Sequence, residues 1–454
     1  MVAPCPKKLS ELNALIWGGA DLNEDIFQRW CQGFYFSPTE PTALMQNGGG
    51  PCAVLAPVQA VILRNMLLSG RFSTAASVEG EFSWFVLIYV LGVDSSELLI
   101  SAILDIMTLV KPNTEKQWTW VHWSNQNGEV CTVESALTPS LFFEGLRSIS
   151  ASSLDELHGL IMSLAPELQS PFAVLCFLYS ILFTHGLSAL RKGMADETDT
   201  LIDPVHGHAS QCLINLLICG QTTPYLFDGE RTISGITLTG IRRQPPTGFL
   251  TLFEALHYCE SGWYLKNPSY PVWILGSETH FTVLASPELQ LVSKEEMPSS
   301  GTATIRQAEM EFAKLSADQD TKSGFITSAQ LGKLLEALNI PFTEESIADI
   351  QRKLDPEELG VILEEPFLRH FFPMEMSNRT SAVSNFQVIH YNGLVKSNAG
   401  GQVRYEFGEA HLLDPTEELI ETDPVDQNPI HRCLRTKWPT IRIRWRGNKV
   451  PSLN

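Results

Sequence analysis

A glycine-rich turn runs directly into an apolar segment at Gln46-Asn47-Gly48-Gly49-Gly50-Pro51-Cys52-Ala53-Val54-Leu55-Ala56. The glycines permit backbone conformations that are closed to most other residues. Pro51 suits the first turn of a helix, where its missing N–H is not needed. The mostly apolar run that follows continues to Leu68 and stops at a Ser-Gly pair. The pattern therefore predicts a buried helix that begins at Cys52.

Cys52 stands at the N-terminus of this predicted helix, where the helix dipole and the free N–H groups favour an anion. A cysteine in such a place is favoured as a thiolate, the form that attacks carbonyl carbons. Gln46 lies shortly before it, and its amide is placed to face the same pocket as a donor to an oxyanion. The alternative is a glycine turn before a buried helix with an inert cysteine, because free cysteines usually pack in cores.

The composition indicates a globular protein of 454 residues, 44% of them hydrophobic and 18% charged. A net charge of −19 argues against nucleic acid or an anionic membrane surface as a partner. The nine cysteines are odd in number, widely spaced and without a CxxC pair, which fits a reducing compartment. No apolar run reaches the roughly 20 residues of a membrane span, and the N-terminus lacks a signal-peptide core. We expect a cytoplasmic or nuclear protein.

A second candidate residue, His280, lies where two predicted strands meet. Residues 271–276 read as a buried strand, and residues 280–285 read as a strand that runs back after a turn. Alternation along the second strand puts His280 and Thr282 on the same face. A Cys–His hydrolase can use a histidine in such a place, because catalytic partners meet in space and not in sequence. The alternative is an ordinary half-buried histidine.

Other stretches predict both helices and strands. We expect helices over 95–110, 171–190 and 249–259, strands over 118–123 and 130–133, and a buried helix or strand over 83–91. Asp203, His206 and His208 stand close together, but no further ligand-rich stretch completes a tetrahedral metal site. We therefore interpret them as a loop whose polar groups cap the following helix, and we predict no metal site.

Residues after Pro298 change in character and resemble a pair of calcium-binding EF-hand loops. Counting from Gly324 puts Gln319 at the first ligand position and Gln330 at the last, where a glutamate is expected. In the second loop, Pro366 occupies the last position. We predict a degenerate EF-hand-like pair that is retained for its shape.

The last part of the chain returns to strand-like sequence, at 386–394, 403–407 and 441–445. We expect these strands to rejoin the sheet that carries His280. The predicted organisation has a main part of the catalytic domain over 1–297, a degenerate EF-hand-like insertion over 298–373, and C-terminal strands over 374–454.

Several separated motifs together resemble the MINDY family of deubiquitinases. They comprise residues 46–56, Leu201-Ile202-Asp203-Pro204 with Leu213-Ile214-Asn215-Leu216-Leu217, Gly276-Ser277-Glu278-Thr279-His280-Phe281-Thr282-Val283, Tyr391-Asn392-Gly393-Leu394 and Thr436-Lys437-Trp438-Pro439. Several motifs in the same order are far more specific than any one of them, and they extend over nearly the whole chain.

The resemblance implies an α+β protein with a papain-like cysteine peptidase fold. It implies cleavage of isopeptide bonds in polyubiquitin, with a preference for chains linked through lysine forty-eight of ubiquitin, and it implies no cofactor. By the resemblance Cys52 is the nucleophile, His280 the general base and Gln46 the oxyanion donor. No third triad residue can be carried over, and Thr282 is only a candidate neighbour of the site. Two alternatives compete: a catalytically silent ubiquitin-binding protein, and a different cysteine acyl-transfer enzyme.

Overall fold

The computed structural model describes residues 2–19, 22–68, 94–125, 137–196, 198–233, 235–292, 305–316, 324–372, 384–413 and 428–454. The chain divides into two compact units. The main unit comprises Met1–Ser293 and Ser384–Asn454, and the inserted unit comprises Lys294–Val383. Residues from before and after the inserted unit therefore belong to the same main unit.

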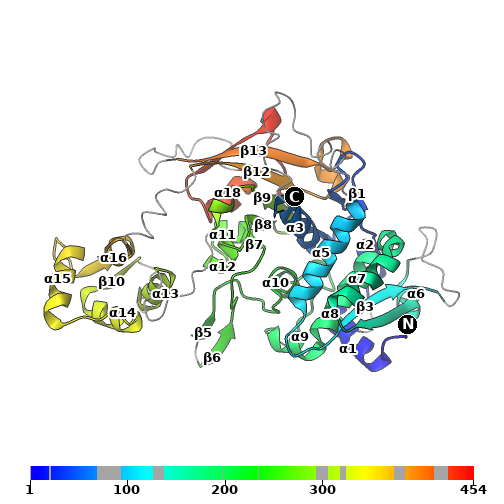
Figure 1. The fold of residues 1–454 in the computed structure, drawn as a ribbon, viewed down its shortest axis with the longest axis horizontal. Helices are drawn as coiled ribbons and strands as arrows, with labels where there is room; N and C mark the ends of the chain where they lie inside the picture. The colour runs from blue at the N-terminus through cyan, green and yellow to red at the C-terminus, as the bar shows by residue number, and fades with distance from the viewer. Residues whose placement is uncertain are drawn as a thin grey trace. The chain divides into compact units, whose positions relative to one another are not determined.

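A six-stranded sheet joins the two parts of the main unit (Figure 1), in the order β14-β13-β12-β9-β8-β7. The strands that precede the inserted unit are β7 (Gly248–Thr251), β8 (Val272–Gly276) and β9 (Phe281–Ala285). Those that follow it are β12 (Asn385–Tyr391), β13 (Tyr405–Leu412) and β14 (Ile441–Trp445). β7 pairs with β8 in parallel, and β12 pairs with β9 antiparallel. The centre of the sheet is thus formed by two strands that are far apart in the sequence.

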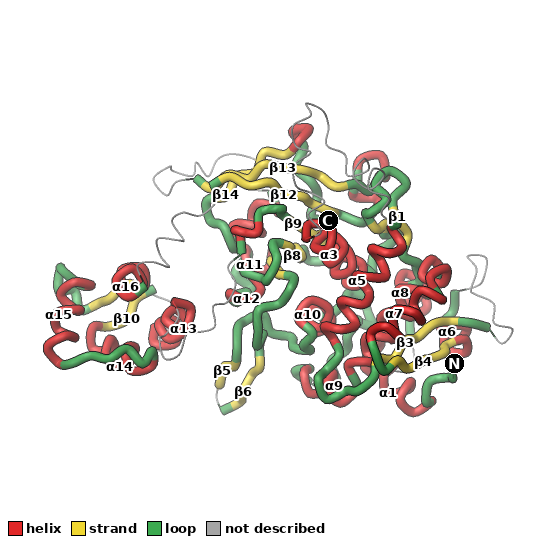
Figure 2. The backbone as a smooth tube through the Cα atoms, in the orientation of Figure 1, coloured by secondary structure: helices red, strands yellow, loops and turns green. Residues whose placement is uncertain are grey.

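Helix α3 (Cys52–Leu68) packs on β8 and β9 and is buried along most of its length. Its residues are apolar on nearly every face, as expected for a helix that is surrounded by other elements. Helices α5, α8 and α10 lie below the large sheet in the view of Figure 2. The helices of the main unit are α1 (Pro6–Trp17), α2 (Glu24–Trp30), α5 (Ser95–Val110), α6 (Pro139–Gly145), α7 (Leu154–Ser163), α8 (Ala173–His185), α9 (Leu187–Gly193), α10 (Gln211–Cys219), α11 (Leu252–Ala255), α12 (Trp263–Lys266) and α18 (Pro429–Arg435).

Three two-stranded sheets complete the main unit: β1 (Tyr35–Phe36) with β2 (Leu44–Met45), β3 (Trp118–Trp123) with β4 (Leu146–Ala151), and β5 (Glu230–Ile233) with β6 (Ile236–Thr239). The predicted strand 118–123 is confirmed as β3. The predicted helix over 249–259 is wrong, because its first residues form β7 and only the short helix α11 follows. The segments 83–91 and 130–133 lie outside the described residues. Within the described residues no single helix is both long and apolar enough to span a membrane. The bent pair α8–α9, taken together, has the length and composition of such a span.

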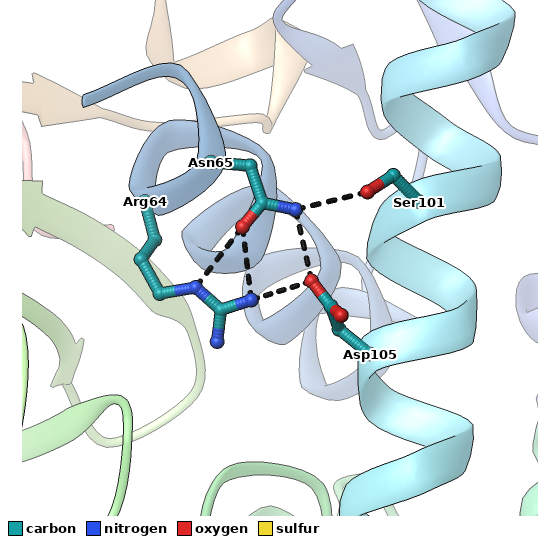
Figure 3. Close-up of polar contacts among 4 residues, drawn as sticks. All are labelled: Arg64, Asn65, Ser101 and Asp105. Atoms are coloured by element: carbon teal, nitrogen blue, oxygen red, sulfur yellow. Dashed lines mark hydrogen bonds and ion pairs between the residues drawn. The ribbon is translucent and has the colours of Figure 1, made fainter. Parts of the chain in front are cut away.

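A polar network fixes α3 against α5 at the end remote from Cys52 (Figure 3). The Arg64 guanidinium donates to Asp105 Oδ2 at 2.6 Å, and the Asn65 amide donates to the same oxygen at 2.9 Å. Asn65 also donates to Ser101 Oγ at 3.2 Å. Arg64 is largely buried, with 11% of its side chain exposed, whereas Asp105 is 43% exposed. The carboxylate of Asp105 is therefore the charged partner of a nearly buried cation, which also donates twice to Asn65 Oδ1, at 2.9 and 3.1 Å.

Replacing Asp105 with asparagine is expected to destabilise the main unit by about 1 to 2 kcal/mol, because Arg64 loses its charged partner at a partly screened site. Urea unfolding followed by tryptophan fluorescence measures this loss, since all ten tryptophans lie outside residues 294–383. Ser101→Ala is the matched control: it removes one exposed hydrogen bond of the same network and is expected to cost less than about 0.5 kcal/mol. Equal losses in the two variants contradict the assignment.

The inserted unit has its own apolar core, which includes Phe312, Leu335 and Phe367. Its helices are α13 (Ile305–Ser316), α14 (Leu331–Ala337), α15 (Glu344–Leu354) and α16 (Glu364–Phe371). Two short strands, β10 (Phe325–Thr327) and β11 (Val361–Leu363), pair antiparallel, and Ile326 lies opposite Ile362. The unit is thus two helix–strand–helix halves joined at a two-stranded sheet.

Candidate active site

Cys52 is the first residue of α3, and only 5% of it is exposed. The preceding turn bends at Gly50, whose φ of +137° is rarely adopted by residues with a side chain. A Cβ at Gly50 would also lie 3.0 Å from Trp30 Nε1. The Cys52 thiol donates to the main-chain oxygen of Gly50, with 3.8 Å between sulfur and oxygen. The turn therefore holds the cysteine at the helix start, as its glycines predict.

His280 lies in the turn between β8 and β9, directly before the first residue of β9. Ser277 closes this turn: its Oγ accepts from His280 N at 3.0 Å, and its N–H donates to the His280 main-chain oxygen at 2.9 Å. The imidazole is 4% exposed, and its Nε2 lies 2.9 Å from Asn392 Oδ1. Burial lowers the pKa of His280, and the hydrogen bond with Asn392 opposes that shift. The imidazole is therefore neutral at physiological pH.

Asn392 follows the last residue of β12, and the sequence alone assigns no role to it. Its Nδ2 donates to the main-chain oxygen of Ser452 at 3.1 Å and faces that of Asn454 at 3.5 Å. An asparagine beside the histidine is the third member of Cys–His–Asn sites. The available signal was a polar residue at the end of an apolar strand, which is weak because 112 positions separate it from His280.

Thr282, the candidate neighbour of the site, lies on β9 and is fully buried. Its hydroxyl has no hydrogen-bond partner among the described residues. The polar contact of the His280 ring is made instead by Asn392, the residue that follows the neighbouring strand β12.

Gln46 is 1% exposed and pairs with the segment that follows β12. Its N–H donates to Gly393 O at 2.8 Å, and its main-chain oxygen accepts from Val395 N at 3.0 Å. Asn392, which contacts His280, directly precedes Gly393 in the chain. One short segment therefore contacts both Gln46 and His280. Tyr391 adds a further link, because its hydroxyl donates to Leu44 O at 2.6 Å. The segment 391–395 thus brings the two predicted polar site residues together.

Two buried glutamine side chains support the backbone that carries Gln46. From α3, Gln59 accepts from Leu44 N at 2.8 Å and donates to Thr42 O at 3.0 Å. From the loop after α2, Gln32 donates to Met45 O at 2.8 Å and accepts from Asn47 N at 3.2 Å. Because both side chains bond to main-chain atoms, the position of Gln46 relative to Cys52 is set by the core and not by the surface.

The acidity of Cys52 differs from the expectation for a helix N-terminus. Burial raises the pKa of the thiol to about 11, although hydrogen bonding by the amides of Phe281 and Ala53 and by the Gln46 side chain opposes this. Desolvation of a thiolate outweighs the favourable dipole at this site. The resting pair is therefore a neutral thiol and a neutral imidazole.

In this structure, main-chain oxygens of the glycine turn accept hydrogen bonds from both the Gln46 amide and the Cys52 thiol. Gln46 Nε2 donates to Gly48 O at 2.6 Å, and the Cys52 thiol points to Gly50 O. A Cβ at Gly48 or Gly49 would meet no atom within 4 Å, so this part of the turn borders open space. One of the two N–H donors of Gln46 Nε2 is therefore engaged by the turn itself.

Asp203, His206 and His208, the candidate metal ligands of the sequence, form no metal site. Groups of three or more His, Cys, Asp or Glu side chains that could hold a metal ion do not occur in the described parts of the chain. The Asp203 carboxylate accepts from the main-chain N–H groups of Val205 and His206, which organises the loop itself. Our interpretation that the loop caps α10 is wrong, because Ser210 is the N-cap and makes no side-chain cap.

A cavity of about 760 Å³ lies next to the turn that carries His280. Glu278 and Thr251 belong to its lining, together with the exposed aromatic side chains of Phe253 and Tyr258. These two rings stack edge to face, with centroids 6.1 Å apart. Cys52, Gln46, His280 and Asn392 are not part of this lining, which combines apolar side chains with charged ones such as Arg231 and Glu278 and suits a protein or peptide ligand.

Comparison with known proteins identifies related sequences. A family model described as "Deubiquitinating enzyme MINDY-3/4, conserved domain" matches residues 19–302. The chain is 39% identical to the Homo sapiens protein named "Ubiquitin carboxyl-terminal hydrolase MINDY-3", over 98% of this chain and 99% of that one. The protein of the same name from Bos taurus is 38% identical over the same shares. A "Ubiquitin carboxyl-terminal hydrolase MINDY-3 homolog" from Drosophila melanogaster is 33% identical, over 99% of this chain and 83% of its own. No solved structure matches the chain.

Proposed function

The chain belongs to the MINDY-3/4 family of deubiquitinating enzymes, and we propose that it hydrolyses isopeptide bonds in polyubiquitin linked through lysine forty-eight of ubiquitin. The proposal makes Cys52 the nucleophile, His280 the general base and Gln46 an oxyanion donor. Asn392 orients the imidazole. The observation that carries these roles is the 2.9 Å contact between Asn392 Oδ1 and His280 Nε2. His280 directly precedes Phe281, whose backbone opposes the rise in the pKa of the Cys52 thiol.

The proposed reaction begins with proton transfer from the Cys52 thiol to His280, because both groups are neutral at rest. The thiolate attacks the carbonyl carbon of the ubiquitin C-terminal glycine, and the oxygen takes up the negative charge. The Gln46 amide and the Cys52 N–H stabilise that oxyanion, and one such donor typically contributes about a hundredfold in rate. His280 then protonates the leaving lysine amine, and water, deprotonated by His280, hydrolyses the thioester.

The Gly48 oxygen accepts one of the two N–H groups of Gln46 Nε2 at 2.6 Å, and a movement of the glycine turn would free that donor for the substrate. The absence of neighbours around Gly48 and Gly49 supports such a movement and leaves room for the narrow Gly-Gly end of ubiquitin. A bound ubiquitin tail would replace the Gly48 oxygen with the carbonyl oxygen of the scissile bond. The resting geometry is therefore a closed form of the proposed site.

We also propose that the main unit is a papain-like cysteine peptidase domain. Support comes from the position of Cys52 at the start of a buried helix, α3, that packs on β9 and β8. The histidine and the asparagine then come from the antiparallel strands of the same sheet. This division between a cysteine on a helix and its partners on a sheet is what a papain-like arrangement requires.

For the inserted unit we propose a degenerate EF-hand pair without calcium. The antiparallel partners Ile326 and Ile362 each follow a glycine of positive φ by two residues, at Gly324 and Gly360. The Asp355 carboxylate accepts from Gly360 N at 2.7 Å, as the first residue of such a loop does. The last ligand positions hold Gln330 and Pro366, and Gln330 already bonds to Thr327 and Leu315. Gln319, the first ligand position of the other loop, lies outside the described residues.

We propose a cytoplasmic or nuclear location and no nucleic-acid partner. The eight described cysteines form no disulfide, and this supports a reducing compartment. The net charge of −19 opposes binding to phosphate backbones.

The deciding experiment incubates the protein with defined long ubiquitin chains of each linkage. Cleavage of chains linked through lysine forty-eight, and of no other linkage, is the expected result. Cleavage of all linkages at similar rates contradicts the linkage proposal, and cleavage of small amides alone favours the other acyl-transfer class. If the protein binds one linkage and cleaves none, it is the silent ubiquitin-binding protein.

A ubiquitin with a C-terminal electrophile tests the nucleophile in the same protein. We expect one covalent adduct, which peptide mass spectrometry locates on Cys52. An adduct on exposed Cys5 or half-buried Cys259 instead contradicts the assignment of Cys52.

A further inference from the structure

The last four residues of the sequence, Pro451 to Asn454, form a tail segment that lies against Asn392. Leu453 of this tail segment is 3% exposed, and Asn392 itself is 5% exposed. Asn392 Nδ2 donates to Ser452 O at 3.1 Å and faces Asn454 O at 3.5 Å. Figure 1 marks this end of the chain close to α3 and β9. The tail segment is therefore packed next to the candidate site and not on a remote surface.

These contacts determine which way round the Asn392 amide lies. The main-chain oxygens of Ser452 and Asn454 can only accept hydrogen bonds, so the edge of the amide that faces them is the NH₂ group. On the other edge, the Leu394 N–H can only donate, and it lies 3.0 Å from Oδ1. Both edges agree, and the orientation is fixed by the hydrogen-bond network. Oδ1 must then be the atom that faces His280.

The orientation of this amide selects the tautomer of His280. Because Oδ1 only accepts, the proton of the neutral imidazole resides on Nε2, 2.9 Å away. Nδ1 is then left as the free base that can take the Cys52 proton. With the amide reversed, its NH₂ group would donate to Nε2, and the proton would move to Nδ1. A triad with the wrong tautomer loses about ten-thousand-fold in kcat in the best-studied serine peptidase case.

We propose that the tail segment is a positioning element of the catalytic site: its main-chain oxygens hold the Asn392 amide in the orientation that keeps the His280 proton on Nε2. The proposal rests on the proposed function of His280 as the base. Without the tail segment, water replaces the two oxygens. Since water both donates and accepts, only the Leu394 N–H still opposes reversal of the amide.

The contacts with Asn392 are made by main-chain oxygens of the tail segment. A substitution that changes a side chain but leaves the main chain in place should therefore keep these contacts. The side chain of Asn454 is exposed, so Asn454→Ala keeps the oxygen in place. Leu453, by contrast, is the buried anchor of the tail segment, and Leu453→Asp is expected to release it. The pair provides a loss variant and a matched control within two neighbouring positions.

The kinetic test compares the full chain, a variant that ends at Val450, Leu453→Asp and Asn454→Ala on polyubiquitin. We expect the first two variants to lose about tenfold to a hundredfold in kcat, with KM changed by less than about twofold, and Asn454→Ala to match the full chain. In an Asn392→Asp background, which has no NH₂ group to orient, ending the chain at Val450 should cost much less. Equal losses in both backgrounds mean that the tail segment acts only on stability, and they overturn the proposal.

The tautomer is measured directly by nitrogen NMR of ¹⁵N-histidine-labelled protein, with the His280 signals assigned from their absence in His280→Gln. The full chain should show the proton on Nε2, and Leu453→Asp should show a mixture of both tautomers. An unchanged tautomer in Leu453→Asp and in the shortened chain overturns the proposal. This measurement needs no cleavage, so failure of the proposed function leaves it decisive.

Discussion

Replacing Cys52 with alanine is expected to abolish cleavage of polyubiquitin, with a fall in kcat on the order of a million-fold. The thiol is the only group proposed to form a bond with the substrate, and neither His280 nor Gln46 can replace it. Little stability should be lost, because the thiol is neutral at rest and only one buried sulfur atom is removed. The measurement is single-turnover cleavage of defined chains, together with binding of the same chains.

Cys212→Ala is the matched control for this prediction. Cys212 is also buried in the first turn of a helix, α10, and burial raises its pKa to about 12. The proposed mechanism assigns no base to Cys212, whereas His280 is the proposed base for Cys52. The Cys212→Ala enzyme should therefore cleave at nearly the normal rate. Cleavage by Cys52→Ala at a rate near that of the normal enzyme would mean that another cysteine is the nucleophile, whereas a small residual rate is expected from the oxyanion donors and substrate binding.

Replacing His280 with alanine is expected to lower kcat by about a thousandfold or more, because a neutral thiol with a pKa of about 11 needs a base. Adduct formation with a ubiquitin electrophile should slow by a similar factor, since it depends on the same proton transfer. His122→Gln is the control: His122 is buried on β3 beside Glu167, in a different sheet. Its loss should lower stability and leave kcat near normal.

The pH dependence of the normal enzyme follows from the same group. Because burial lowers the pKa of His280 from its usual 6.5, the imidazole stays unprotonated into mildly acidic solution. The acid limb of kcat/KM is therefore expected below pH 6.5. The stability of the protein should change in the same direction. Because His280 is harder to protonate in the folded state than in the unfolded state, its contribution to the free energy of unfolding is lost as pH falls from about 6.5 toward the lowered pKa. An acid limb above pH 7 would contradict a buried neutral histidine as the base.

The parts of the site that the sequence predicts well are those with a local cause. The glycines and Pro51 require a turn that ends in a helix, and that requirement places Cys52 at the start of α3. The His280 strand is nearly as local, because apolar residues on both sides of a short turn predict β8 and β9. In both cases the residues that decide the structure are neighbours in the chain.

The parts that the sequence does not predict depend on distant partners. The prediction that the strand over 386–394 rejoins the sheet of His280 is confirmed, but its neighbour in that sheet was not predicted. Asn392 reaches His280 because β12 pairs directly with β9. Residues 249–251 are the start of the helix predicted over 249–259, but they form part of β7 because β8 lies beside them in parallel. The raised pKa of the Cys52 thiol also depends on residues that are far from it in the sequence, because the residues that bury it come from several elements. Local patterns contain none of this information.

The division of the six-stranded sheet also affects how the protein is made. His280 is synthesised 112 positions before Asn392, which takes roughly 6 to 22 s at typical rates of translation. During that time the nascent chain lacks β12, β13 and β14, so its histidine has no asparagine and the Gln46 backbone has no partner strand. Pairing of such distant strands is slow to nucleate, and it becomes available only as the ribosome finishes the chain. For about a quarter of its synthesis, a growing polypeptide thus carries both Cys52 and His280 without the strands that complete the candidate site.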